Sequence, residues 1–168
     1  MKKISLLTLL ITVIFTCPVS GQNHSKAVAN GITIPDGYQQ WQLISSSYRE
    51  DNKSLRVILG NDKAMEAALA GQTNPWPDGA ILGKLVWKED RHPKWPAAII
   101  PGDLSHIEFM IKDQARYPET GGWGFARWIG MELEPYGKDR SFEQECFGCH
   151  TPVKDNDYVF TKLSPLPR

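Results

Sequence analysis

Short runs of alternating apolar and polar residues recur along the chain after about residue 35, and they predict a β-rich fold. The segments expected to form strands are 41–48, 55–59, 80–88, 105–112, 125–129 and 157–160. The clearest alternation is in 80–88. There, every second residue points to one face of the expected strand: Ala80, Leu82, Lys84, Val86 and Lys88. A lysine in the middle of an apolar face is unusual, and its common explanation is a long side chain that reaches solvent.

Helical spacing is confined to short segments. Asn61 or Asp62 is expected to cap a helix that ends at Gly71. Apolar residues recur in it at near-helical spacing: Ala64, Met65, Ala68 and Leu69. A second short helix is predicted to begin at Ser141, with Gln144 completing a capping box. The predicted fold class is therefore α+β, predominantly an antiparallel β-sheet with short helices.

The segment 89–103 shows no clear period and contains three prolines: Pro93, Pro96 and Pro101. It is predicted to be a long irregular connection. A connection of this length is often functional, although it can also be a simple crossing of the surface.

The first 21 residues have the pattern of a secretory signal peptide. Two lysines precede an apolar run over residues 4–15, and small residues at 19–21 favour cleavage before Gln22. The run is short for a membrane span, and an uncleaved N-terminal anchor is the alternative. We therefore expect an exported, periplasmic protein with a signal peptide at 1–21 and a single domain at 22–168.

Charge argues against some classes of partner. The whole chain of 168 residues has 19 basic and 19 acidic residues. Removal of Lys2 and Lys3 with the signal leaves 17 basic and 19 acidic residues, a net charge of −2. Such a surface does not favour nucleic acid or an anionic membrane as the main partner.

Near the C-terminal end, Cys146-x-x-Cys149-His150 is the attachment motif of a c-type haem. The two thiols can each form a thioether to a haem vinyl group, and the adjacent imidazole can ligate the iron. The alternatives are a redox dithiol or half of a zinc site. A zinc site needs further Cys or His ligands, and the other histidines are scattered along the sequence. Small soluble cytochromes with this motif are commonly all-helical. A four-helix cytochrome would need long helical periods that this chain lacks, so the haem is expected to pack against the sheet.

Beyond the motif, the sequence resembles cytochrome P-460, the exported haem enzyme of ammonia- and methane-oxidising bacteria. The resemblance covers about residues 35–160. The matching stretches are 56–62 (RVILGND), 74–80 (NPWPDGA), 121–128 (GGWGFARW), 135–139 (PYGKD) and 146–157 (CFGCHTPVKDND).

The resemblance implies a β-rich homodimer whose haem c is of the P-460 type. Cys146 and Cys149 would form the thioethers, His150 would be the iron's axial ligand, and the opposite, distal side of the iron would be open. The resemblance also implies a covalent bond between a lysine nitrogen and a haem meso carbon. Lys84 is favoured over Lys88, because Leu82 and Val86 are expected to enclose it in an apolar pocket that favours a neutral amine.

The function implied by the resemblance is oxidation of hydroxylamine to nitrous oxide or nitrite, and also oxidation of nitric oxide. A soluble acceptor such as a cytochrome c would take the electrons. One alternative is a β-type cytochrome c-prime, which shares the fold and binds nitric oxide without the cross-link. Another is simple electron transfer with a methionine as sixth ligand, for which the candidates are Met65, Met110 and Met131.

Other residues are candidates for supporting roles. Glu108 is the expected distal proton relay, with a solvated strand residue as the alternative; the family's distal carboxylate can also fall at Gln114, where an amide would relay protons poorly. Arg127 is expected to pair with a haem propionate or to form a structural ion pair. Phe109 and Phe125 are candidates to line the pocket, with core packing as the alternative.

Overall fold

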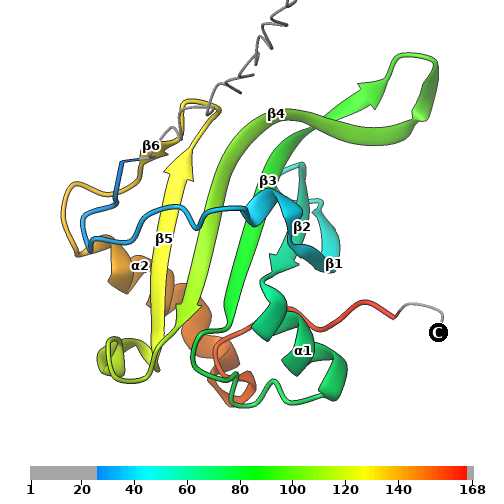
Figure 1. The fold of residues 1–168 in the computed structure, drawn as a ribbon. Coiled ribbons are helices and arrows are strands. Elements are labelled where there is room, and N and C mark those ends of the chain that lie inside the picture. Colours follow the sequence, from blue (N-terminus) through cyan, green and yellow to red (C-terminus); the bar gives the residue numbers. More distant parts are fainter. Residues whose placement is uncertain (1–25, 166–168) are drawn as a thin grey trace, which may run out of the picture.

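The computed structural model describes residues 26–165. Its centre is a six-stranded antiparallel sheet in which the strands follow one another in chain order (Figure 1). The strands are β1 (Gln42–Arg49), β2 (Ser54–Gly60), β3 (Ile81–His92), β4 (Trp95–Lys112), β5 (Trp123–Ile129) and β6 (Glu134–Pro135). The helices are α1 (Asp62–Ala70) and α2 (Phe142–His150), with 3-10 turns η1 (Tyr38–Gln40), η2 (Pro118–Thr120) and η3 (Thr151–Asn156). The predicted fold class is confirmed, whereas the predicted signal peptide lies outside the described residues.

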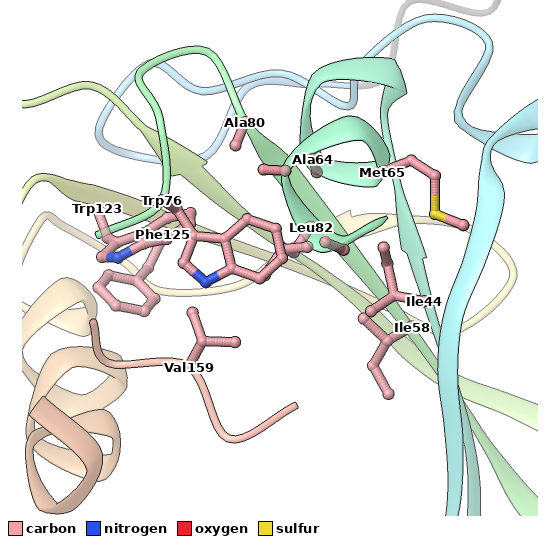
Figure 2. Packing of buried hydrophobic residues seen from close by; sticks show 12 residues of the cluster. Ile44, Ile58, Ala64, Met65, Trp76, Ala80, Leu82, Trp123, Phe125 and Val159 are labelled. Carbon is pink, nitrogen blue, oxygen red and sulfur yellow. The ribbon is translucent and has the colours of Figure 1, made fainter. Parts of the chain in front are cut away.

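Each face of the sheet is covered by a different part of the chain. On one face, α1 and the segment after η3 pack against the sheet, and buried residues such as Leu82, Phe125 and Val159 form one core (Figure 2). On the other face, the N-terminal segment crosses the strands and buries Ile107, Phe109 and Trp128 in a second core (Figure 1). Among residues 26–165, none of the helices has the length and apolar character needed to span a membrane.

The segment 89–103 is not an irregular connection, as the sequence suggested, but the end of a long hairpin. β3 pairs with β2 only up to Lys88, and β4 pairs with β5 only from His106 onward. Between these limits β3 and β4 pair only with each other, and the ribbon projects from the sheet (Figure 1). A proline on the free edge of such a ribbon removes no ladder hydrogen bond, so Pro96 and Pro101 can lie within β4.

Two predictions near the C-terminal end are wrong. Residues 157–160 do not form a strand, because Asp157 and Tyr158 both have positive φ angles, which no strand contains. Ser141 precedes α2 but its side chain makes no capping hydrogen bond, because its own backbone is already helical. An N-cap residue needs an extended backbone to aim its side chain at the first turn.

Asn61 joins α1 to the sheet. Its side-chain oxygen accepts hydrogen bonds from the backbone nitrogens of Ala64, in the first turn of α1, and Ile81, the first residue of β3; both distances are 3.0 Å. Its amide nitrogen donates to the carbonyl of Gly79 at 2.9 Å. The side chain therefore caps the helix and fixes the entry into β3, the strand that carries Lys84.

We expect Asn61→Ala to lower the free energy of unfolding by about 1–2 kcal/mol, because it removes an N-cap and leaves two backbone donors without their acceptor. Urea denaturation followed by circular dichroism measures the change. Asn61→Asp is the matched control, since it keeps the acceptor oxygen and should lose much less. Equal losses in both variants would contradict the capping role.

Candidate haem site

Helix α2 carries the three residues of the haem motif. Cys146 is half-buried and Cys149 is exposed, and both are free thiols, as thioether formation requires. His150 is the last residue of the helix. Helix α2 lies against β5, so the motif sits beside the sheet rather than in a separate lobe (Figure 1).

The imidazole of His150 is held by a backbone acceptor and by two aromatic rings. Its Nδ1 donates a hydrogen bond to the carbonyl of Tyr158 at 2.7 Å. The ring centroids of Phe125 and Phe160 each lie 5.3 Å from that of His150. Burial lowers the pKa of His150, and the hydrogen bond to Tyr158 only partly opposes this. A neutral imidazole with the hydrogen on Nδ1 keeps the lone pair of Nε2 free to bind iron.

The acceptor for His150 depends on an unusual stretch of backbone. Asp157 and Tyr158 have φ angles of 48° and 62°, in the left-handed region that costs about 1–2 kcal/mol for each non-glycine residue. The ring of Tyr158 packs so closely over Gly121 that a Cβ added there would overlap it. Only glycine fits at that position, so the first residue of the run Gly121-Gly122 serves the proximal side of the site.

A row of charged side chains crosses the same face of the sheet. Lys84 on β3 is the register partner of Glu108 on β4, which in turn pairs with Arg127 on β5. One carboxylate oxygen of Glu108 forms an ion pair with the amine of Lys84. The other accepts from Arg127, at 2.6 Å from Nε and 2.5 Å from Nη2. His106 approaches the same oxygen at 3.6 Å.

The row keeps Glu108 ionised. Its side chain is only 16% exposed, and burial by itself would raise its pKa. The positive charges of Lys84 and Arg127 outweigh burial and hold the pKa of Glu108 at about 2. The amine of Lys84 is therefore paired with a carboxylate, and not enclosed by apolar side chains alone as the sequence suggested.

The charged row and the haem motif belong to one site. Burial raises the pKa of the Cys146 thiol to about 11, and the nearby charges of Arg127 and Glu108 also act on it. On the neighbouring strand β2, burial lowers the pKa of Arg56. The Cys146 thiol thus lies within electrostatic reach of the charged row.

The residues present fit a c-type haem. Two free thiols and an imidazole with a free nitrogen are the donor set that such a haem needs. Arg56 adds a second observation: within the described part of the chain, its buried Nε has no hydrogen-bond partner. A guanidinium N–H of this kind suits a haem propionate. Sequence reasoning missed Arg56, which looks like an ordinary strand residue in the run 55–59.

Of the other residues that the sequence suggested for the site, only one lies beside the haem motif. Phe125 lies beside His150, but Phe109 is on the opposite face, packed against Tyr38, Trp41 and Trp128. Lys88 is exposed in the last pair between β3 and β2, opposite Ser54, and Gln114 is exposed near Gly122, outside the charged row.

The methionines proposed as sixth ligands have different environments. Met65 is buried in the core with α1, Met110 is half-buried against the same core, and Met131 is 74% exposed. Core packing therefore accounts for Met65. Across residues 26–165, no three His, Cys, Asp or Glu side chains converge as a metal-binding group, so the geometry does not favour the zinc alternative.

Comparison with known proteins supports the haem assignment. A family model described as Cytochrome P460 matches residues 35–161, most of the chain. The search of curated proteins gives no match. The family match includes every residue of the charged row, the haem motif and the segment that holds His150.

We expect each of Cys146→Ala and Cys149→Ala to keep haem through one remaining thioether. The double variant, made in the Lys84→Met background so that no lysine bond can retain the haem, should lose covalent haem entirely. His150→Gly should keep both thioethers but change the iron's coordination. Haem staining after denaturing electrophoresis measures covalent attachment, and the absorption spectrum reports the ligand. Full covalent haem in the double variant would contradict the assignment.

Proposed function

The chain belongs to the cytochrome P460 family, and on that premise we propose that it is a periplasmic haem oxidoreductase that oxidises hydroxylamine to nitrous oxide or nitrite, and also oxidises nitric oxide to nitrite. Members of this family are c-type haem iron proteins and are typically exported, and a bond between the haem and a lysine is characteristic of them. The proposal rests chiefly on one observation. The amine of Lys84 and the ionised carboxylate of Glu108 form an ion pair beside the haem motif.

Lys84 is the lysine that we assign to the cross-link. It lies in the charged row, 30% exposed, and its charge acts on Cys146, whereas Lys88 is exposed in the last pair between β3 and β2. Bond formation replaces an N–H of the amine and a C–H of the haem meso carbon by a C–N bond. Two protons and two electrons leave, so the step needs an oxidant such as hydrogen peroxide. The ion pair with Glu108 holds the Lys84 amine in place for this step.

The bond also changes Glu108. A lysine nitrogen attached to an aromatic carbon no longer carries a positive charge near neutral pH, so Glu108 keeps Arg127 as its principal cationic partner. Burial, which already acts to raise its pKa, is then opposed by less charge. The pKa of Glu108 should therefore rise from about 2 toward the range in which a carboxylate is an effective general base.

Proton removal is the task that we assign to Glu108. Two hydroxylamine molecules give nitrous oxide and water with the release of four protons and four electrons, and one hydroxylamine with water gives nitrite with five protons and four electrons. The haem, when bound, supplies the centre that accepts the electrons. Glu108 accepts protons, while Arg127 orients the carboxylate through its two nitrogens and Arg56 is available to a haem propionate.

The remaining parts of the proposal come from the family resemblance. We propose a homodimer and a soluble electron acceptor such as a cytochrome c. A β-type cytochrome c-prime that binds nitric oxide is the second candidate, because the same β fold would serve it. The carboxylate beside Lys84 favours the enzyme, since gas binding alone needs no proton acceptor.

The lysine assignment predicts a strongly red-shifted Soret band for the ferrous wild type, and a haem peptide that joins Lys84 to residues 146–150. Lys84→Met should give an ordinary c-type spectrum, and Lys88→Met is the matched control that should leave the cross-link intact. Absorption spectroscopy and mass spectrometry of the digest measure both. A wild type with both lysines free would instead support the gas-binding cytochrome.

For Glu108→Gln we expect kcat/KM for hydroxylamine to fall by roughly 10²-fold or more, because a general base is lost while the shape of the side chain is kept. In the wild type, kcat/KM should fall as the pH is lowered and Glu108 becomes protonated, with a midpoint above pH 2. Steady-state kinetics with an artificial electron acceptor measure both effects. Glu66→Gln, on the exposed side of α1, makes the same chemical change elsewhere and should have no effect. An unaltered rate in Glu108→Gln would exclude the base.

A further inference from the structure

A buried ion pair lies under the segment that holds His150. The amine of Lys112, at the end of β4, is completely buried and lies 2.8 Å from a carboxylate oxygen of Asp157, whose side chain is 9% exposed. The same amine donates to the carbonyl of Gly121 at 3.0 Å and lies 5.0 Å from the ring centroid of Trp123. The side chains of Lys112 and Asp157 have no role in the function proposed above.

Every oxygen of Asp157 is engaged. Its second carboxylate oxygen accepts from the backbone nitrogen of Trp76, and its carbonyl accepts from the indole nitrogen of Trp123, both at 2.8 Å. Three contacts from three parts of the chain therefore hold one residue in a left-handed conformation. Trp76 and Trp123 lie close together beside Val159 in the same core (Figure 2).

The next residue along the chain is the one that matters for the iron. Tyr158 follows Asp157 directly, and its carbonyl accepts the hydrogen bond from Nδ1 of His150 at 2.7 Å. We infer that Lys112 and Asp157 are positioning residues, which fix the Tyr158 carbonyl and thereby set the strength of the hydrogen bond on the iron's axial ligand. The inference rests on the proposed ligation of haem iron by His150.

Stability alone does not explain the pair. Taking two charges out of water is costly, and apolar residues of similar size are often as stabilising as a buried ion pair. A specific geometric role accounts for it better. A hydrogen bond from the second nitrogen of a ligating histidine raises the basicity of the ligand and so tunes the metal. The Lys112–Asp157 pair holds the Tyr158 carbonyl in place, and it therefore acts on the iron through the hydrogen bond to His150.

The test replaces both charges at once. In the double variant Lys112→Met, Asp157→Asn, no buried charge is left without a partner, and asparagine tolerates the left-handed backbone. Resonance Raman spectroscopy of the ferrous holoprotein should show the iron–histidine stretch at a lower frequency than in the wild type. The midpoint potential should be higher, because a less basic ligand stabilises ferric iron less.

Asp157→Asn alone is the second variant. It keeps an oxygen that can accept from Lys112 and should shift both quantities in the same direction by a smaller amount. It also keeps the test decisive if the double variant does not fold.

Ile32→Ala is the control for a loss of stability without a positioning effect. Ile32 belongs to the N-terminal segment and is buried in the other core. This variant should unfold at a lower urea concentration while its iron–histidine stretch and midpoint potential stay at the wild-type values.

The outcomes separate the two proposals. The positioning role would be overturned if the folded double variant had the iron–histidine stretch and the midpoint potential of the wild type. If the double variant does not accumulate, the same result in folded Asp157→Asn would overturn it. A wild type without an iron–histidine stretch would instead overturn the ligation by His150 on which the inference rests.

Discussion

The site depends on the register of three neighbouring strands. Lys84, Glu108 and Arg127 are direct partners across β3, β4 and β5, so their charges meet only in this alignment. A slip of one residue would turn Glu108 to the opposite face, where Phe109 now packs against Trp128. The two hydrophobic cores fix the register, because each face must bury its own apolar residues. The chemistry of the site is thus set by the packing on both sides of the sheet.

Much of the fold could be predicted because the deciding signals are local. Alternation within 80–88 correctly placed Lys84 on one face with Leu82 and Val86, and the cap at Asn61 and the stop at Gly71 correctly bounded α1. The ribbon of 89–103 was missed, since three prolines normally argue against a strand, and only a free edge tolerates them. The end of the chain was misassigned because left-handed backbone at Asp157 and Tyr158 comes from tertiary contacts, not from residue type.

The candidate site was predictable to the same extent. Cys146, Cys149 and His150 form a contiguous motif, and Lys84 is unusual within its strand. The pairing of Glu108 with Lys84 requires the alignment of two strands that a single sequence does not specify. The acceptor for His150 is a backbone carbonyl, so the residue type at position 158 gives no indication of the hydrogen bond. Arg56 was missed for a related reason, since a lone strand arginine acquires meaning only when its Nε is found buried without a partner.

The separation of Lys84 and Cys146 along the chain has a further consequence for the unfolded state. If the haem is joined to both residues, it closes a covalent loop of about 60 residues, and the chain-entropy relation used for disulfides gives about 4 kcal/mol of destabilisation of the denatured state for a loop of that size. In the proposed attachment the haem uses both Cys146 and Cys149, so the protein would have the benefit of a disulfide without forming one. The haem would then be a covalent cross-link between β3 and the C-terminal helix α2.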